Sequence, residues 1–214
     1  MKTREIAKTI ENNAQRVIDN IDLQSVQYCS FLISEFRETD IIGNLQFQLV
    51  FRRFQGMNKV GFSDEFIREY FKLLEKYKYK SEPDIETVFT ELDRLKNFRG
   101  KNSLMFSFVT KFMCTLDDSI PIYNNEVCRV FSITQPNNPD TSALYSLLDY
   151  LEVIRDAYNE LVDGDLIRKT MKLFDTKFGE FDLPLIKRLD FIFWSCGNLD
   201  IFNKQPELNQ YQNN

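Results

Sequence analysis

The sequence predicts an all-α fold, with a single compact, multi-helix domain over residues 1–203 and a frayed polar tail over residues 204–214. Hydrophobic residues make up 43% of the 214 residues and aromatic residues 14%, which is enough for a buried core and excludes a disordered chain. Only 7 Gly and 6 Pro are present, fewer than the turns of a β-sandwich or barrel of this length require. Apolar residues also recur at three- and four-residue spacing along most of the chain, as they do in amphipathic helices.

The first half of the chain contains four predicted helices. The first is indicated by apolar residues at helical spacing, namely Ile6, Ile10, Ala14, Val17 and Ile21, and the second covers about residues 25–38. Residues 45–51 alternate briefly and suit a short strand, but their context, which includes Phe54, favours a helix. Residues 56–61 contain two glycines and are predicted to form a loop. Ser63 then has the position of an N-cap for the fourth helix.

The second half is also predicted to be helical. Residues 81–84 (Ser-Glu-Pro-Asp) carry two helix-start signals, and the helix that follows runs to about Leu95. Ser103 can cap the next helix, from Leu104 to Leu116, which is apolar nearly all round and is therefore expected at the centre of the fold. Helices over about 140–162, 166–178 and 184–196 complete the chain.

Residue usage limits the chemistry that is open to this protein. The chain has no His, which excludes a His-based catalytic triad and His-containing zinc sites. Its four cysteines are widely spaced without a Cys-x-x-Cys pair, and we expect reduced, mostly buried thiols (Cys29, Cys114, Cys128 and Cys196). We therefore expect no metal and no cofactor. Any enzyme built on this chain has to use Asp, Glu, Lys, Tyr, Ser or Cys.

Charge is unevenly distributed along the chain. The net charge of -5 weighs against a nucleic-acid partner, because phosphate contacts need Lys and Arg. Residues 94–116, however, contain no acid and five basic residues, which are Arg94, Lys96, Arg99, Lys101 and Lys111. Residues 117–165 are strongly acidic. A local basic surface of this kind suits one short stretch of phosphates, and a solvated charged face is the alternative.

Three short segments carry a resemblance to a known family. Residues 98–103 (Phe-Arg-Gly-Lys-Asn-Ser) lie between two predicted helices, and they are followed by residues 107–111 and by residues 121–127 (Pro-Ile-Tyr-Asn-Asn-Glu-Val). This arrangement resembles the helix-hairpin-helix DNA glycosylase superfamily, and its 8-oxoguanine glycosylase branch most. The resemblance implies a hairpin over about residues 98–103 whose main-chain N–H groups hold a phosphate of double-stranded DNA. The implied DNA-binding residues are Arg99, Gly100, Lys101, Asn102 and Ser103.

The resemblance also implies a pocket for an extruded base, with altered catalytic positions. The family's nucleophilic Lys falls on Leu104, and its essential Asp falls on Asn124. Nearby groups that can substitute are the amines of Lys101 and Lys111 and the carboxylates of Asp117, Asp118 and Glu126. We take Lys111, Asn124 and Asp118 as the candidate catalytic residues, and Tyr123 and Phe54 as candidates to stack on the base.

Each candidate also has an ordinary structural interpretation. Lys111 can be a surface or snorkelling lysine on a helix edge. Asp117 and Asp118 can end a helix and start a turn, Asn124 can cap the next helix, and Glu126 can occupy the first turn of that helix.

Three hypotheses for the function follow. The chain is a glycosylase-like hydrolase of base excision repair, a catalytically inactive relative that binds DNA, or a helical protein-interaction domain. We expect no signal peptide in the N-terminal residues, and no window approaches the roughly 18 apolar residues of a membrane span. We expect a cytoplasmic protein without membrane contact, associated with the nucleoid if it binds DNA.

Overall fold

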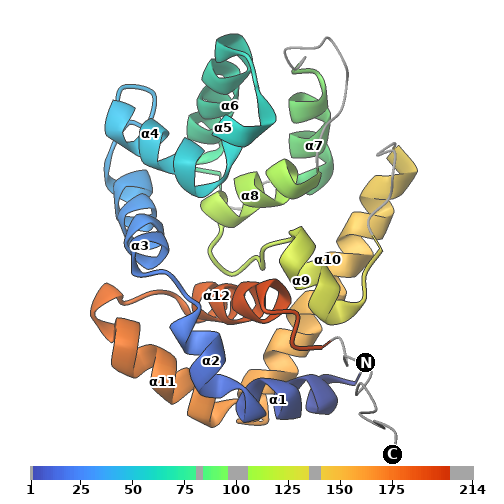
Figure 1. The fold of residues 1–214 in the computed structure, drawn as a ribbon. Coiled ribbons are helices and arrows are strands. Elements are labelled where there is room, and N and C mark those ends of the chain that lie inside the picture. Colours follow the sequence, from blue (N-terminus) through green and yellow to red (C-terminus); the bar gives the residue numbers. More distant parts are fainter. Residues whose placement is uncertain (1, 81–83, 96–105, 135–140, 203–214) are drawn as a thin grey trace, which may run out of the picture.

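Helices are the only regular secondary structure in the computed structural model, which describes residues 2–80, 84–95, 106–134 and 141–202 (Figure 1). The all-α prediction is therefore confirmed for these ranges. In chain order the elements are α1 (Thr3–Asn12), α2 (Ala14–Asp19), α3 (Leu23–Glu38), α4 (Leu45–Phe54), α5 (Met57–Val60), α6 (Asp64–Tyr77), α7 (Ile85–Asp93), α8 (Phe106–Leu116), α9 (Asn125–Phe131), α10 (Thr141–Asp163), α11 (Arg168–Phe178), the 3-10 helix η1 (Gly179–Phe181) and α12 (Leu185–Asn198).

The helices form two groups that α3 connects (Figure 1). In the upper group of Figure 1, α6 and α7 pack against α8, and α4 packs against α3. In the lower group, α12 packs against α9 and α2, while α1 contacts α10 and α11. Buried apolar side chains from both groups belong to one continuous hydrophobic cluster. The space between the two groups is where the candidate site lies.

Side-chain caps explain where several helices begin. Asp22, Asn44, Ser63, Asp84 and Asn124 each accept a hydrogen bond from the main-chain N–H three residues later. Such a bond satisfies one of the N–H groups that the first turn of a helix leaves without a partner. The cap predicted at Ser63 is confirmed, and so is the helix over residues 45–54.

Two predictions for the first third of the chain need correction. The first helix is broken at Asn13, which has a φ of -111°, although the apolar stripe on both sides of the break is buried as expected. The loop predicted for residues 56–61 contains the short helix α5, because Gly56 and Gly61 adopt positive φ angles of 71° and 73° on either side of it. Met57 anchors this helix in the core and is 1% exposed.

The other helix predictions agree with the described residues to within a few positions. The helix predicted from Leu104 is described from Phe106 onward and ends at Leu116, as expected. All four cysteines are free and buried, as predicted. Among the residues described, no helix has the length and apolar character needed to cross a membrane.

Candidate functional site

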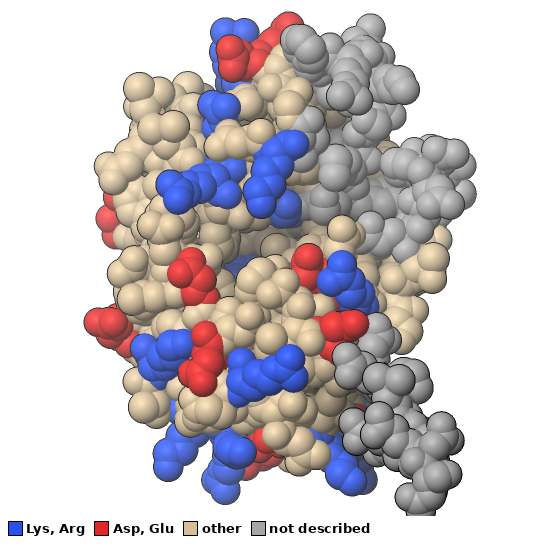
Figure 2. Space-filling model, viewed as in Figure 1, with Lys and Arg blue, Asp and Glu red and all other residues tan. Residues whose placement is uncertain are grey.

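A cavity of about 1050 Å³ opens between the two groups of helices. One side is formed by residues of α3 and α4 and by the end of α6, and the other by residues of α8, α9 and α12. Figure 2 shows the opening as a hollow near the middle of this face, with Lys and Arg side chains above it and Asp and Glu side chains along its lower edge. The volume lies just above the roughly 300–1,000 Å³ that is typical of small-molecule pockets.

Lys111 is a lysine of the cavity wall whose amine is largely buried and has a lowered pKa. Its Nζ donates a hydrogen bond to the main-chain oxygen of Gln55, at 2.7 Å, and stands 4.5 Å from the centre of the Phe108 ring. Burial lowers the pKa of Lys111 to about 8, and the charge of Glu126 offsets part of this shift. Of the two orientations considered from the sequence, the structure has the inward one. A pKa of about 8 leaves roughly a tenth of the amine neutral at pH 7, and Lys111 belongs to the lining of the cavity.

The segment that precedes α9 contributes Ile122 to the floor of this side of the cavity and is held at four successive residues. A main-chain N–H or C=O group of each residue bonds to a side chain of α8 or α12. The bonds join Lys187 Nζ to Ile120 O (3.1 Å), Cys114 Sγ to Pro121 O (3.3 Å), Asp190 Oδ1 to Ile122 N (3.0 Å) and Thr110 Oγ1 to Tyr123 O (3.3 Å). We call residues 120–123 the floor segment. Its conformation is fixed by side chains from two helices.

Two of those side chains form a buried ion pair on α12. Lys187 Nζ lies 3.7 Å from Asp190 Oδ2, and both residues are 8% exposed. The hydroxyl of Tyr158 donates a further hydrogen bond to Asp190, at 3.3 Å. Burial raises the pKa of Asp190 to about 6, and the charge of Lys187 limits the rise. Burial alone would lower the pKa of Lys187, but nearby acidic groups, Cys114 first and then Asp190, outweigh it and raise that pKa.

Asn124 follows the floor segment and lines the cavity. Its Oδ1 accepts a hydrogen bond from Val127 N at 2.9 Å, so the side chain caps α9, which is the ordinary interpretation given above. Helix α9 is itself fixed by Gly197 of α12. A Cβ on Gly197 would lie 2.0 Å from the main-chain oxygen of Glu126, so only glycine allows the two helices to approach this closely.

The three candidate carboxylates differ in their surroundings. Asp117 Oδ1 accepts a hydrogen bond from Ser119 N at 2.8 Å, which is the turn expected after α8. Asp118 forms an ion pair with Arg37, and this pair joins the end of α3 to the loop after α8. Glu126 lines the cavity in the first turn of α9 and is the carboxylate whose charge acts on Lys111.

The two residues predicted to stack on a base are placed differently. Phe54 is half-buried and lines the cavity, together with Phe191 and Trp194. Tyr123 is 1% exposed, packs against Tyr150 with the ring centres 6.2 Å apart, and does not line the cavity. The prediction for Tyr123 was therefore wrong. The residue lies next to Asn124 in the sequence, but the extended backbone there turns successive side chains to opposite sides.

The predicted hairpin and its DNA-binding residues, Arg99, Gly100, Lys101, Asn102 and Ser103, lie outside the described residues, and so does Leu104. Of the basic window found in the sequence, the structure describes Arg94, which is exposed, and Lys111. Sequence reasoning missed other basic residues that line the cavity, namely Arg53, Lys59, Lys78 and Lys80. The alternation Lys-Tyr-Lys-Tyr-Lys over residues 76–80 was the signal for two of them.

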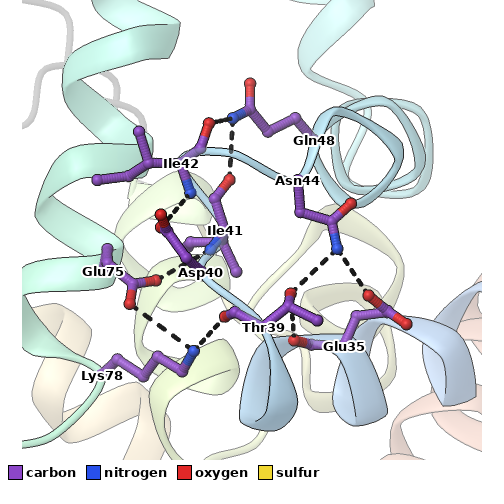
Figure 3. Close-up of polar contacts among 9 residues, drawn as sticks. All are labelled: Glu35, Thr39, Asp40, Ile41, Ile42, Asn44, Gln48, Glu75 and Lys78. Atoms are coloured by element: carbon purple, nitrogen blue, oxygen red, sulfur yellow. Dashed lines mark hydrogen bonds and ion pairs between the residues drawn. The ribbon is translucent and has the colours of Figure 1, made fainter.

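Lys78 connects the end of α6 to the corner between α3 and α4 (Figure 3). Its side chain is 3% exposed, donates to Thr39 O and pairs with Glu75 at 3.8 Å. Glu75 also accepts from Ile41 N, at 3.2 Å, while Asn44 donates to Glu35 and Thr39. We call these contacts the corner network. They hold the side chain of Lys78 at the edge of the cavity, and main-chain bonds from Lys78 N to Glu75 O and from Lys80 N to Tyr77 O continue the turn after α6.

Comparison with family models, with curated proteins and with solved structures gave no match for this chain.

Proposed function

We propose that this protein binds DNA and accommodates an extruded nucleotide in the cavity, in the manner of a helix-hairpin-helix DNA glycosylase, in order to remove or recognise a damaged or modified base. One observation carries the proposal. The cavity opens beside Asn124, the position of the family's essential acid, and contains the amine of Lys111 with a pKa of about 8. A largely buried, partly neutral amine in the wall of a cavity that is large enough for a nucleotide suits attack on a sugar carbon.

Removal of a base would use the residues of the cavity in distinct roles. The neutral amine of Lys111 attacks C1′ of the sugar, and the base leaves with the electron pair of the glycosidic bond and takes up a proton. Opening of the sugar ring then gives an imine on Lys111. Glu126 is the carboxylate best situated to stabilise the cationic sugar, because its charge already acts on Lys111. Phe54 and Trp194 offer rings for stacking.

Recognition without removal is the second candidate, and a specific observation favours it. Asn124 supplies a neutral amide where the family has a carboxylate, and its Oδ1 is already engaged by Val127 N. Asp118 is paired with Arg37. Loss of one charge-stabilising group commonly costs on the order of 3 kcal/mol in the transition state, so binding survives such changes better than catalysis does.

Borohydride trapping tests the proposal directly. The protein is incubated with a duplex that contains one abasic site and is reduced with borohydride, and the adduct is mapped by mass spectrometry. We expect a single adduct on Lys111 that Lys111→Met abolishes. Lys172→Met, which changes an exposed lysine of α11, is the matched control and keeps the adduct.

Two further measurements separate the candidates. A base-release assay on duplexes with damaged bases detects removal that uses no amine. Salt-sensitive duplex binding without adduct or base release supports recognition alone. Absence of adduct, base release and DNA binding together contradicts the proposal and leaves a helical protein-interaction domain.

A further inference from the structure

The mouth of the cavity carries two tyrosines that are each accompanied by cations. The guanidinium group of Arg53 lies 5.7 Å from the centre of the Tyr28 ring, and Lys59 lines the same side. Tyr79 is 80% exposed, and the Nζ of Lys78 lies 5.3 Å from its ring centre, with Lys80 next in the chain. All six residues line the cavity. Exposed rings beside cations are the elements with which proteins bind unpaired nucleic-acid strands.

The contacts of Lys78 place Tyr79 towards the C-terminal end of α3, whereas Tyr28 lies nearer the N-terminal end of that helix. Lys78, which contacts Tyr79, also stands over Phe36, 5.5 Å from its ring centre. Phe36 follows Tyr28 by eight residues on α3, a separation of about 12 Å along the helix axis. This length corresponds to about three to four phosphates at the roughly 3.4 Å spacing of a stacked strand.

Tyr79 is exposed but its main chain is well anchored. The corner network ties the preceding residue, Lys78, to α3 and to the loop before α4 (Figure 3). The exposed ring of Tyr79 is therefore attached to an anchored backbone at the cavity edge, with Lys78 Nζ 5.3 Å from its centre. Such preorganisation lowers the entropic cost of stacking a base on it.

The other side of the mouth is lined by three carboxylates, one of which, Asp118, is paired with Arg37. Asp117, Asp118 and Glu126 line it, and acidic side chains border the lower edge of the hollow in Figure 2. A duplex carries phosphates on both strands, so one strand would face these carboxylates. A single strand can lie along the basic side alone.

We infer that the mouth of the cavity binds an unpaired DNA strand, with bases stacked on Tyr28 and Tyr79 and phosphates near Arg53, Lys59 and Lys80. The inference rests on the proposed function and narrows its substrate to a nucleotide in single-stranded or locally unpaired DNA. The cavity then receives a base that needs no extrusion from an intact duplex, which removes the cost of unpairing it.

Fluorescence anisotropy with two probes at the same salt concentration tests this inference. The probes are a short labelled oligothymidylate and a labelled duplex of equal length. We expect tighter binding of oligothymidylate, and an affinity about tenfold lower for Tyr79→Ala and for Tyr28→Ala, as the loss of one stacked base predicts. Lys80→Gln should reduce the slope of log affinity against log salt by about 0.7, the value for one phosphate contact on a single strand.

Two matched variants control for the loss of a ring in general. Tyr79→Phe retains the ring and should bind as the unmodified protein does. Tyr145→Ala removes a 59% exposed tyrosine of α10 that does not line the cavity, and it should also leave binding unchanged.

The outcomes separate this inference from the proposed function. Equal or tighter binding of the duplex overturns the inference, as does unchanged oligothymidylate binding by Tyr79→Ala, while the borohydride adduct on duplex DNA still supports the proposed function. Failure to bind either probe overturns both.

Discussion

Lys111 and Lys187 line the same cavity but have opposite electrostatic properties. Lys187 has a carboxylate partner, Asp190, and its pKa is raised. Lys111 has a main-chain carbonyl as its hydrogen-bond partner, and burial lowers its pKa to about 8. The comparison shows that burial alone does not define a reactive lysine. A buried amine paired with a carboxylate stabilises the fold, whereas a buried amine without such a partner is available for chemistry.

Lys187→Met should have the largest effect on stability. It leaves Asp190 buried without its counter-charge and removes the bond to Ile120 O, and we expect the free energy of unfolding to fall by about 3–5 kcal/mol. Urea denaturation at pH 7 measures the change. The double variant with Asp190→Leu should recover much of the loss, since both charges are then absent. A loss below about 1 kcal/mol for the single variant would contradict the structural role of the pair.

Lys111→Met should change stability in the opposite direction and make the protein more stable. Charging the buried amine costs free energy at neutral pH, so we expect a gain in stability of about 1–3 kcal/mol, reduced by the lost bond to Gln55 O. In the unmodified protein, stability should rise as the pH increases from about 8 to the ordinary pKa of 10.5, because only the unfolded chain is then protonated at Lys111. The variant should lack this rise. If Lys111→Met instead lowers the free energy of unfolding, the charge of Lys111 is compensated by contacts in the folded protein.

The reaction of Lys111 with an aldehyde should depend on pH in a way that the reaction of Lys187 does not. Trapping of an aldehyde on Lys111 should increase about tenfold per pH unit up to about pH 8 and then level off, because the neutral amine is the nucleophile. Lys187 should stay unmodified over the same range. Mass spectrometry of peptides after borohydride reduction distinguishes the two residues. Adduct formation on Lys187 below pH 8 would remove the distinction between them.

Substitutions at Asn124 should have the smallest effect on stability. They also test whether a nearby carboxylate makes Lys111 resemble Lys187. Asn124→Ala removes the cap of α9 and should cost about 1 kcal/mol. Asn124→Asp keeps the cap and adds a negative charge beside the cavity, so it should raise the pKa of Lys111 towards that of a paired amine. The pH dependence of aldehyde trapping reports this change, and an unchanged pH profile would show that the two residues do not interact.

The sequence predicted the helices more reliably than it predicted the site. Periodic apolar residues and capping residues such as Ser63 are local signals, and the structure confirms them. Tyr123 was assigned wrongly because a position next to Asn124 does not determine which side of the backbone a side chain occupies. Arg53 belongs to α4 and Lys80 to the segment after α6, and only the tertiary fold brings them to one cavity. Asp190, which pairs with Lys187 and makes it differ from Lys111, is likewise brought into place only by packing.

Trp194 lines the cavity and is the chain's only tryptophan. Its emission therefore originates from one place, beside the proposed position of the base. Stacking of a nucleobase on an indole quenches its fluorescence, so titration of the unlabelled protein reports occupancy of the cavity without any added dye. The fold thus contains its own optical probe, which follows ligand entry in real time.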